Sequence, residues 1–361
     1  MENSKTGQSE FIELIINGTI QVPKAYPNDA LIGLEVSIGA VGLIGNILVV
    51  LTILRTKGLH YLTNYLILNL AIADALVSLC SILNPWLLWG KYAPDELPSC
   101  FTNKTIDSYV EVQIYSIFQR GLEDSSPMCL LLLTVERFVG IVHPLRHPEF
   151  FRSRRLVVLL LLAWIVPFLL ELPAGLWFII KYLNNNCWAS TAKEEPWIVL
   201  IPVVSSILSV LVPVLAMIVM YTGIMRSLKR NARSLEHQGI NGPPQELHRA
   251  HQRVVHTLIL VTVAFALLIF PCRAIYITTV ANLVNTEPQP VIQQQIVVIL
   301  GALNSSINPF LYGFKYDKFR KAVIMMVCCN RRRNNVVPAR IEVTTVNGTE
   351  NTVPSQKDPE T

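Results

Sequence analysis

Seven apolar segments limit what this 361-residue chain can fold into. Each reaches roughly the 20 residues that a helix needs to cross the hydrocarbon core of a bilayer. Charged residues make up only 15% of the chain, whereas a soluble domain typically has about 25%. The sequence therefore predicts an all-α membrane protein, a seven-transmembrane helix bundle with spans at residues 30–54, 62–88, 108–142, 156–180, 196–225, 254–281 and 291–314.

Basic residues mark one side of this bundle. They concentrate in alternate connections and in the tail, for example at Arg55, Arg146, Arg230 and Lys315. Because cytoplasmic loops carry an excess of Lys and Arg, we expect a multi-pass protein of the plasma membrane with its N-terminus outside. The resulting parts are an extracellular N-terminal segment (1–29), the bundle (30–314), an amphipathic helix (315–329) and a disordered cytoplasmic tail (330–361).

Sequons agree with this orientation, although they are common in any sequence. Asn17-Gly18-Thr19 and Asn103-Lys104-Thr105 fall on the outer side, so both asparagines are predicted N-glycosylation sites. The sequon at Asn304 lies within a span, and the sequon at Asn347 lies on the inner side. We therefore interpret these two as chance matches.

The residues after the last span indicate attachment to the inner leaflet. Phe319 and Val323 are four residues apart among basic residues, which favours a short amphipathic helix lying on the membrane surface. Cys328 and Cys329 follow beside the basic run 331–333, a setting typical of S-palmitoylation. The alternative is two unmodified thiols.

The stretch from Asn308 through Pro309 to Tyr312 stands near the inner end of the last segment. A proline within an apolar helix removes a backbone donor and kinks the helix. We expect Asn308 to satisfy the freed backbone and Tyr312 to place a hydroxyl near the membrane edge. Such residues are tolerated in a span only where other groups complete their hydrogen bonds, so this helix is more typical of a moving part than of an anchor.

Polar and proline residues recur in every span, and polar residues within spans are usually functional. In chain order they are Gly45-Asn46, residues 70–74, Glu136-Arg137-Phe138, Trp164, Pro213 and Tyr221, Phe265 and Pro271, and Asn304-Ser305 with Asn308-Pro309. This ordered set resembles the rhodopsin-like (class A) G-protein-coupled receptors over roughly residues 30–329. The run 265–273 is most similar to neuropeptide receptors, including the thyrotropin-releasing-hormone type.

The resemblance implies a switch that activates a heterotrimeric G protein. Arg137 would be paired with Glu136 at rest and would open toward the G protein when the receptor is active. The sixth helix, kinked at Pro271, would move outward. The implied switch residues are Glu136, Arg137, Phe138, Pro144, Tyr221, Asn308, Pro309 and Tyr312. The alternative for Arg137 is an arginine that snorkels at the membrane boundary.

The resemblance also implies an allosteric sodium ion, held by Asp74, Ser126, Asn304, Ser305 and Asn308. A lone carboxylate within a span needs a cation or a proton, and hydroxyl and amide oxygens suit a hard cation. The alternative is a protonated Asp74 that is merely packed in the core.

Three positions depart from the family pattern. Glu136 replaces the usual Asp, and Ile269 stands where the family usually has a Trp that senses ligand. His251 stands where many members carry an acidic partner for the switch arginine. From these departures we expect an unusual trigger and a weaker resting state with some basal activity.

Cys100 and Cys187 resemble the family's extracellular disulfide. The bond would form in an oxidising compartment. However, Cys100 lies farther before Arg137 than the family pattern has it. We interpret residues 101–111, which include Asn103, as an enlarged outer loop.

The outer halves of the spans carry unusual charge, and the predicted ligand pocket combines four of these charged residues with two neutral ones: Arg120, Glu123, Asp124 and Arg273, with Gln119 and Ile269. Gln119 stands where amine receptors carry an Asp, which argues against a biogenic amine, although Glu123 and Asp124 could still hold a cation one turn deeper. Arg273 offers a planar fork for carboxylate or amide oxygens. A peptide is therefore the favoured ligand, with a non-peptide small molecule as the alternative. The charges could instead form an internal ion-pair network with Glu171.

Other functional classes fit the sequence less well. A transporter would show paired half-sequences with broken helices in corresponding places, and no such repeat is visible. No Lys occurs in residues 291–314 to bind retinal, and no nucleophile–base set indicates an enzyme. The expected partners are the extracellular ligand, a heterotrimeric G protein, membrane lipids and arrestin, with no nucleic acid.

Overall fold

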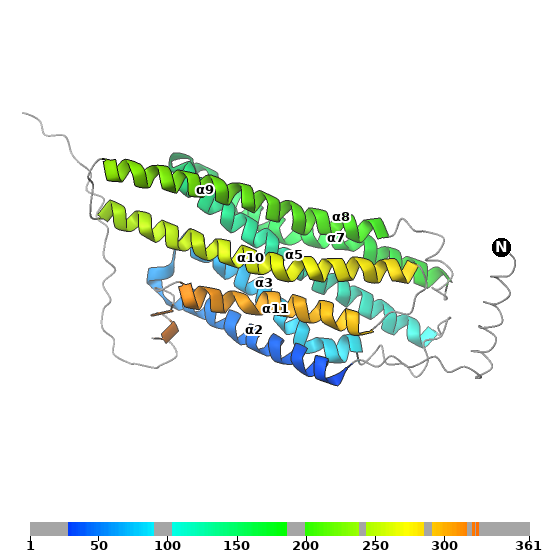
Figure 1. Cartoon of the computed structure of the whole chain (residues 1–361). Helices are drawn as coiled ribbons and strands as arrows, with labels where there is room; N and C mark the ends of the chain where they lie inside the picture. Colours follow the sequence, from blue (N-terminus) through cyan, green and yellow to red (C-terminus); the bar gives the residue numbers. More distant parts are fainter. Residues whose placement is uncertain are drawn as a thin grey trace, which may run out of the picture.

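The computed structural model describes residues 28–89, 103–185, 199–237, 243–284 and 291–315, together with residues 320, 321, 323 and 324. Within this part of the chain the regular structure is helical. Seven rods run lengthwise beside one another (Figure 1). They are α2 (Asp29–Arg55), α3 (Leu62–Asn84), α5 (Asn103–Val142), α7 (Ser153–Asn185), α8 (Leu200–Ser206) continued by α9 (Val212–His237), α10 (Pro243–Val284) and α11 (Val291–Lys315).

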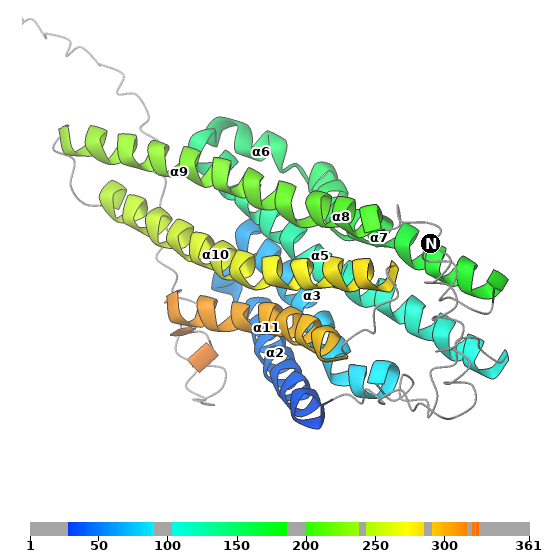
Figure 2. The same ribbon diagram turned by 45° about the vertical axis from the view of Figure 1, so that its right-hand side comes forward.

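The long helix α5 lies in the middle of the bundle. It packs against α3, α7 and α9, while α11 packs against α2 and α10 at one edge. Figure 2 shows α2 and α11 side by side, with α10 between α11 and α9. The core between these helices contains fully buried apolar side chains such as Leu70, Leu133 and Met217.

Six of the described helices are long and apolar enough to cross a membrane, judged by length and composition. They correspond to the first six predicted spans. The seventh, α11, carries polar residues such as Gln293 and Asn304 and is not among these six. Large apolar side chains such as Ile44, Leu161 and Val219 are more than half exposed on the outside of the bundle, a surface that suits lipid rather than water.

Caps and prolines explain where the helices begin and bend. The Asn28 side chain accepts hydrogen bonds from the backbone N–H groups of Ala30 and Leu31, at 2.9 and 3.2 Å, and so caps α2. Pro213 lacks an N–H and its ring crowds the carbonyl four residues earlier. A π-helical turn, Ile207–Leu211, stands at this point and joins α8 to α9.

The carbonyl freed by Pro309 is satisfied from another helix. Pro309 cannot donate to the carbonyl of Ser305, four residues earlier. The side-chain amide of Asn46, on α2, donates to that oxygen at 3.0 Å. The expectation that Asn308 would do this was wrong, because the Asn308 side chain points to Asp74 and donates to it instead.

The outer end of α5 differs from the prediction. Residues 103–111, which we expected within an enlarged loop, are the first turns of the helix. No Gly or Pro interrupts the chain between Asn103 and Gly121, so nothing in this stretch stops a helix. Figure 2 shows the outer ends of α5 and α7 projecting beyond their neighbours.

Several predicted features lie outside the described residues: Asn17, the proposed disulfide Cys100–Cys187, Cys328 and Cys329, and the tail from residue 330. Of the amphipathic helix after α11, Arg320, Lys321, Val323 and Ile324 are described, and all are helical. Val323 packs against the main core whereas Ile324 is exposed.

Glycines allow α2 to approach α3 and α11 closely. A Cβ at Gly39 would lie 2.9 Å from the backbone oxygen of Ser78, and a Cβ at Gly45 would lie 3.1 Å from the ring of Pro309. At Gly42 a Cβ would overlap the side chains of Ser78 and Ser306. These contacts leave no room for larger residues on this face of α2.

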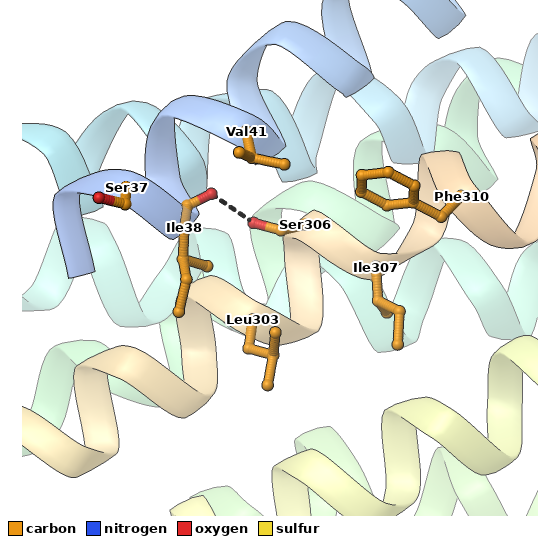
Figure 3. A pocket seen from close by; sticks show the side chains of 7 residues that line it. All are labelled: Ser37, Ile38, Val41, Leu303, Ser306, Ile307 and Phe310. Carbon is orange, nitrogen blue, oxygen red and sulfur yellow. Dashed lines mark hydrogen bonds between the residues drawn. The ribbon is translucent and has the colours of Figure 1, made fainter. Parts of the chain in front are cut away.

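A shallow groove lies between α2 and α11 on the side of the bundle (Figure 3). It is lined by Ser37, Ile38, Val41, Leu303, Ser306, Ile307 and Phe310. The Ser306 hydroxyl points across the groove and donates to the carbonyl oxygen of Ile38 at 2.9 Å. The groove is otherwise apolar, and none of the predicted ligand-pocket residues lines it.

We expect Gly39→Ala to destabilise the bundle by about 1–3 kcal/mol, the usual cost of overpacking a close contact. The added methyl group would meet backbone, which cannot rotate away. Thermal unfolding of the purified protein in lipid discs measures the effect. Gly33→Ala is the matched control, because nothing lies within 4 Å of that position. An equal melting temperature for both variants would refute the close packing.

Candidate functional site

The basic end of the bundle is the end that carries Arg55, Arg146 and Arg253. Glu136 and Arg137, both near the end of α5, form a two-pronged ion pair there. Arg137 Nε donates to Glu136 Oε2 at 2.6 Å, and Arg137 Nη2 donates to Oε1 at 2.7 Å. The sequence predicted this pairing, and paired donors of this kind form strong hydrogen bonds.

Two further groups fix the buried carboxylate of Glu136. The Thr63 hydroxyl on α3 donates to Oε2 at 3.1 Å. His147, in the short helix α6 (His147–Phe150), places Nε2 3.1 Å from Oε1. Neither partner was predicted. The only sequence signal for His147 was its position in the same connection as Pro144. Pro144 lies in the 3₁₀ turn Pro144–Arg146, and His147 follows this turn directly.

The remaining predicted switch residues lie near this ion pair or deeper in the bundle. Phe138 packs against α9, where a Cβ on Gly223 would lie 2.8 Å from its ring. The Tyr221 hydroxyl is hydrogen-bonded to Thr134 on α5 at 2.9 Å and to Thr262 on α10 at 3.1 Å. Tyr221 therefore joins three helices. The Tyr312 side chain lies outside the described residues, so its predicted meeting with Tyr221 stays a prediction.

Asp74, in the middle of α3, is fully buried and accepts hydrogen bonds from two other helices. Ser126 Oγ on α5 donates to Oδ1 at 2.8 Å, and Asn308 Nδ2 on α11 donates to Oδ2 at 2.7 Å. The Ser305 side chain also contacts Asp74, and Asn304 is buried beside it in the chain. The structure thus brings three of the four other predicted sodium-site residues, Ser126, Ser305 and Asn308, to the Asp74 carboxylate.

These groups fit a small hard cation. Among the described residues Asp74 has no Lys or Arg partner, and the hydroxyl oxygens of Ser126 and Ser305 are suitable further ligands. Asn308 turns its N–H toward Asp74, so it serves here as a hydrogen-bond donor rather than as an oxygen ligand.

The predicted ligand-pocket charges come together in the outer half of the bundle, near the middle of α5. We call Arg120, Glu123, Asp124, Glu171 and Arg273 the outer charge cluster. Arg120 Nε donates to Glu171 Oε2 at 2.8 Å, and the Ser205 hydroxyl on α8 donates to Oε1 at 2.6 Å. Arg120 also lies over the ring of Tyr276, 5.3 Å from its centroid.

The second half of the cluster links α10 to α5. Arg273 Nη2 forms an ion pair with Asp124 Oδ1, and its Nη1 lies 3.8 Å from Glu171 Oε1. Gln119 Nε2 donates to Glu123 Oε1 at 3.2 Å. The internal ion-pair network considered from the sequence is therefore present. Ile269 is buried one turn before Arg273.

Sequence reasoning missed three polar contacts near these sites. Tyr115 donates to Asn84, which donates to the buried carboxylate of Glu35 at 2.6 Å. Trp164 Nε1 donates to Asn69 Oδ1 at 3.0 Å. All three contacts pair residues more than 30 positions apart in the chain, and no local sequence pattern predicts such pairs.

Comparison with known proteins agrees with this architecture. Residues 45–312 match the 7 transmembrane receptor (rhodopsin family). The chain belongs to this family. It is therefore a receptor of the G-protein-coupled class and a multi-pass membrane protein rather than an enzyme, and α11 is the seventh span of the bundle.

Individual relatives are more distant. Somatostatin receptor type 5 of Bos taurus is 28% identical over 295 residues, covering 81% of this chain and 74% of the receptor. Allatostatin-A receptor of Bombyx mori is 25% identical over 319 residues, covering 87% and 84%. Octopamine receptor beta-1R of Drosophila melanogaster is 26% identical over 310 residues, covering 78% and 58%. Peptide and amine receptors thus both occur among the relatives.

We expect Glu136→Gln to raise ligand-free G-protein dissociation. A neutral amide cannot hold Arg137 through two charge-assisted bonds, and each 1.4 kcal/mol lost shifts the resting equilibrium about tenfold. Glu149→Gln is the matched control, because that carboxylate is largely exposed and its ion pair with Arg155 is long, at 3.8 Å. Equal basal signals from the two variants, at equal surface expression, would argue against the ion pair as a restraint.

Proposed function

We propose that this receptor binds an extracellular peptide and activates heterotrimeric G proteins by outward movement of α10. The observation that carries the G-protein side is the pair of Arg137 with Glu136 at the basic end. An arginine held by one buried carboxylate can be released by a small helix movement. Once released, it can reach a protein bound at that end.

The distribution of charge supports the orientation that this proposal needs. Arginines gather where α2, α6, α7, α9 and α10 begin or end at the basic end, including Arg55, Arg155 and Arg253. By the positive-inside rule this end faces the cytoplasm. The N-terminus and the outer charge cluster then face the cell exterior, where a ligand arrives.

The structure of α10 supports its role as the moving helix. It carries Pro271, which removes a backbone donor and makes the helix easy to bend at that point. On the basic side of Pro271, Thr262 bonds to Tyr221. On the outer side, Arg273 is paired with Asp124. A change at the outer pair can therefore alter the position of the inner half of α10.

Two observations support a peptide ligand: the names of the relatives, and the residue Gln119 on α5. The names of the somatostatin and allatostatin-A receptors denote peptide ligands. Gln119, which is neutral, stands where amine receptors carry an acidic residue, as the resemblance implied. The name of the octopamine receptor denotes an amine ligand, so a non-peptide small molecule is the second candidate. The buried carboxylates of Glu123 and Asp124 favour it.

A screen of peptides on cells expressing this chain tests the proposal, with G-protein dissociation as the readout. We expect at least one peptide to produce dissociation, and we expect Arg137→Ala at equal surface expression to abolish it. The reason is that Arg137 is the group proposed to reach the G protein. Responses of equal size in cells with and without Arg137 would contradict this role.

We also propose that a sodium ion binds at Asp74 and stabilises the resting bundle. An ion that binds only the folded protein stabilises it by about 1.4 kcal/mol when its concentration is about ten times Kd. The wild-type protein should therefore melt at a higher temperature in sodium chloride than in choline chloride of equal ionic strength. In Asp74→Asn this difference should vanish, and its persistence would place the sodium effect elsewhere.

A further inference from the structure

The outer charge cluster has one more carboxylate than it has guanidinium groups. Arg120 pairs with Glu171, and Arg273 pairs with Asp124. Glu123 accepts a hydrogen bond from the neutral amide of Gln119. It is nine-tenths buried and lies against the backbone of Gly301 on α11. A buried carboxylate needs a cation or a proton, and the cations near Glu123 are the same Arg120 and Arg273. As anions, the three carboxylates therefore exceed the two guanidinium groups by one charge.

The Arg273–Asp124 pair joins α10 to the central helix of the bundle. Arg273 lies two residues beyond Pro271, and Asp124 lies on α5. The other described polar contacts in this part of α10 are weaker. Cys272 Sγ lies 3.5 Å from the carbonyl oxygen of Val297 on α11, Arg273 Nη1 lies 3.8 Å from Glu171 Oε1, and Arg120 lies 5.3 Å from the ring centroid of Tyr276. The ion pair is therefore the main polar restraint on the outer half of α10 within the described residues.

Burial makes this pair a two-state element. Asp124 is fully buried and Arg273 is 5% exposed, so separating them in place leaves two charges without water. Glu171 offers Arg273 a second carboxylate, 3.8 Å from Nη1. If a new cation takes over Asp124, Arg273 still has a counter-ion within reach. Opening the pair is then possible for a ligand that brings positive charge, whereas an anionic ligand would meet three carboxylates.

We propose that the Arg273–Asp124 ion pair is a latch that holds α10 at rest, and that the agonist opens it with a cationic group received by Asp124 and Glu123. This proposal rests on the proposed peptide-receptor function. It specifies the ligand as a peptide whose amino terminus, Lys or Arg enters the outer charge cluster. The ligand supplies the missing positive charge and releases α10 in the same step.

The latch itself is tested without any ligand. Asp124→Asn and Arg273→Gln should each raise ligand-free G-protein dissociation about tenfold. The exchanged pair Asp124→Arg with Arg273→Asp should return it to the wild-type level, because the attraction is restored with reversed polarity. Asp29→Asn, an exposed position at the start of α2, is the matched control and should have no effect.

The ligand chemistry is tested with paired synthetic peptides. Each member of the library carries one Lys and has a twin with norleucine at that position and a blocked amino terminus. Wild-type receptor should respond to the Lys member at a concentration at least tenfold lower than to its twin. Glu123→Gln should reduce this preference. Equal potency of the twins on the wild-type receptor overturns the proposal, and this measurement needs no variant to fold.

The remaining outcomes also decide between the hypotheses. If the single variants reach the surface with unchanged basal signals, the latch is excluded. If they fail to reach it and only the exchanged pair does, the ion pair is structural, because a latch must tolerate opening. Glu136→Gln separates this test from the proposed function. A signal from that variant without one from Asp124→Asn removes only the latch, whereas silence from every variant and every peptide removes G-protein activation itself.

Discussion

The missing amide hydrogen of Pro309 sets the packing of three helices. Without that donor the Ser305 carbonyl needs a partner, and Asn46 supplies it from α2. The two helices must then lie close together, and Gly45 allows this because its missing side chain makes room for the proline ring. The residue before the proline, Asn308, donates to Asp74 on a third helix, α3. One absent hydrogen bond thus accounts for the close approach of α2 to α11 at Gly45.

The two ends of the bundle treat buried charge differently. At the basic end a single carboxylate, Glu136, receives hydrogen bonds from Arg137 and Thr63, and His147 lies beside it. Its charge is balanced locally, so the arrangement is stable with nothing bound. At the outer end the guanidinium groups are shared among helices α5, α7 and α10, and the carboxylates outnumber them. Ionic balance there depends on what enters from outside.

The sequence allowed the helices and the family to be predicted because each depends on local patterns. Apolar runs located the first six spans, and the order of Asp74, Arg137 and Pro309 identified the family. Contacts between distant residues were harder. The side chain that satisfies Ser305 was assigned to its neighbour Asn308 rather than to Asn46, since a sequence shows which groups need partners but not which helix faces them. The ion pairs could be predicted more successfully than these hydrogen bonds, because the spans contain only a few charged residues that could pair.

The helical start of α5 changes the shape of the entrance to the receptor. At 1.5 Å per residue, the turns from Asn103 to Glu111 add about 12 Å of rigid rod. A loop of that length could fold down over the bundle, whereas a rod keeps its far end at a fixed height. If Cys100 is tied to Cys187 as the sequence predicts, the outer loop after α7 is anchored at the top of this rod. A ligand would then have to pass this anchored loop before reaching Arg120, which lies 17 residues farther along α5 than Asn103.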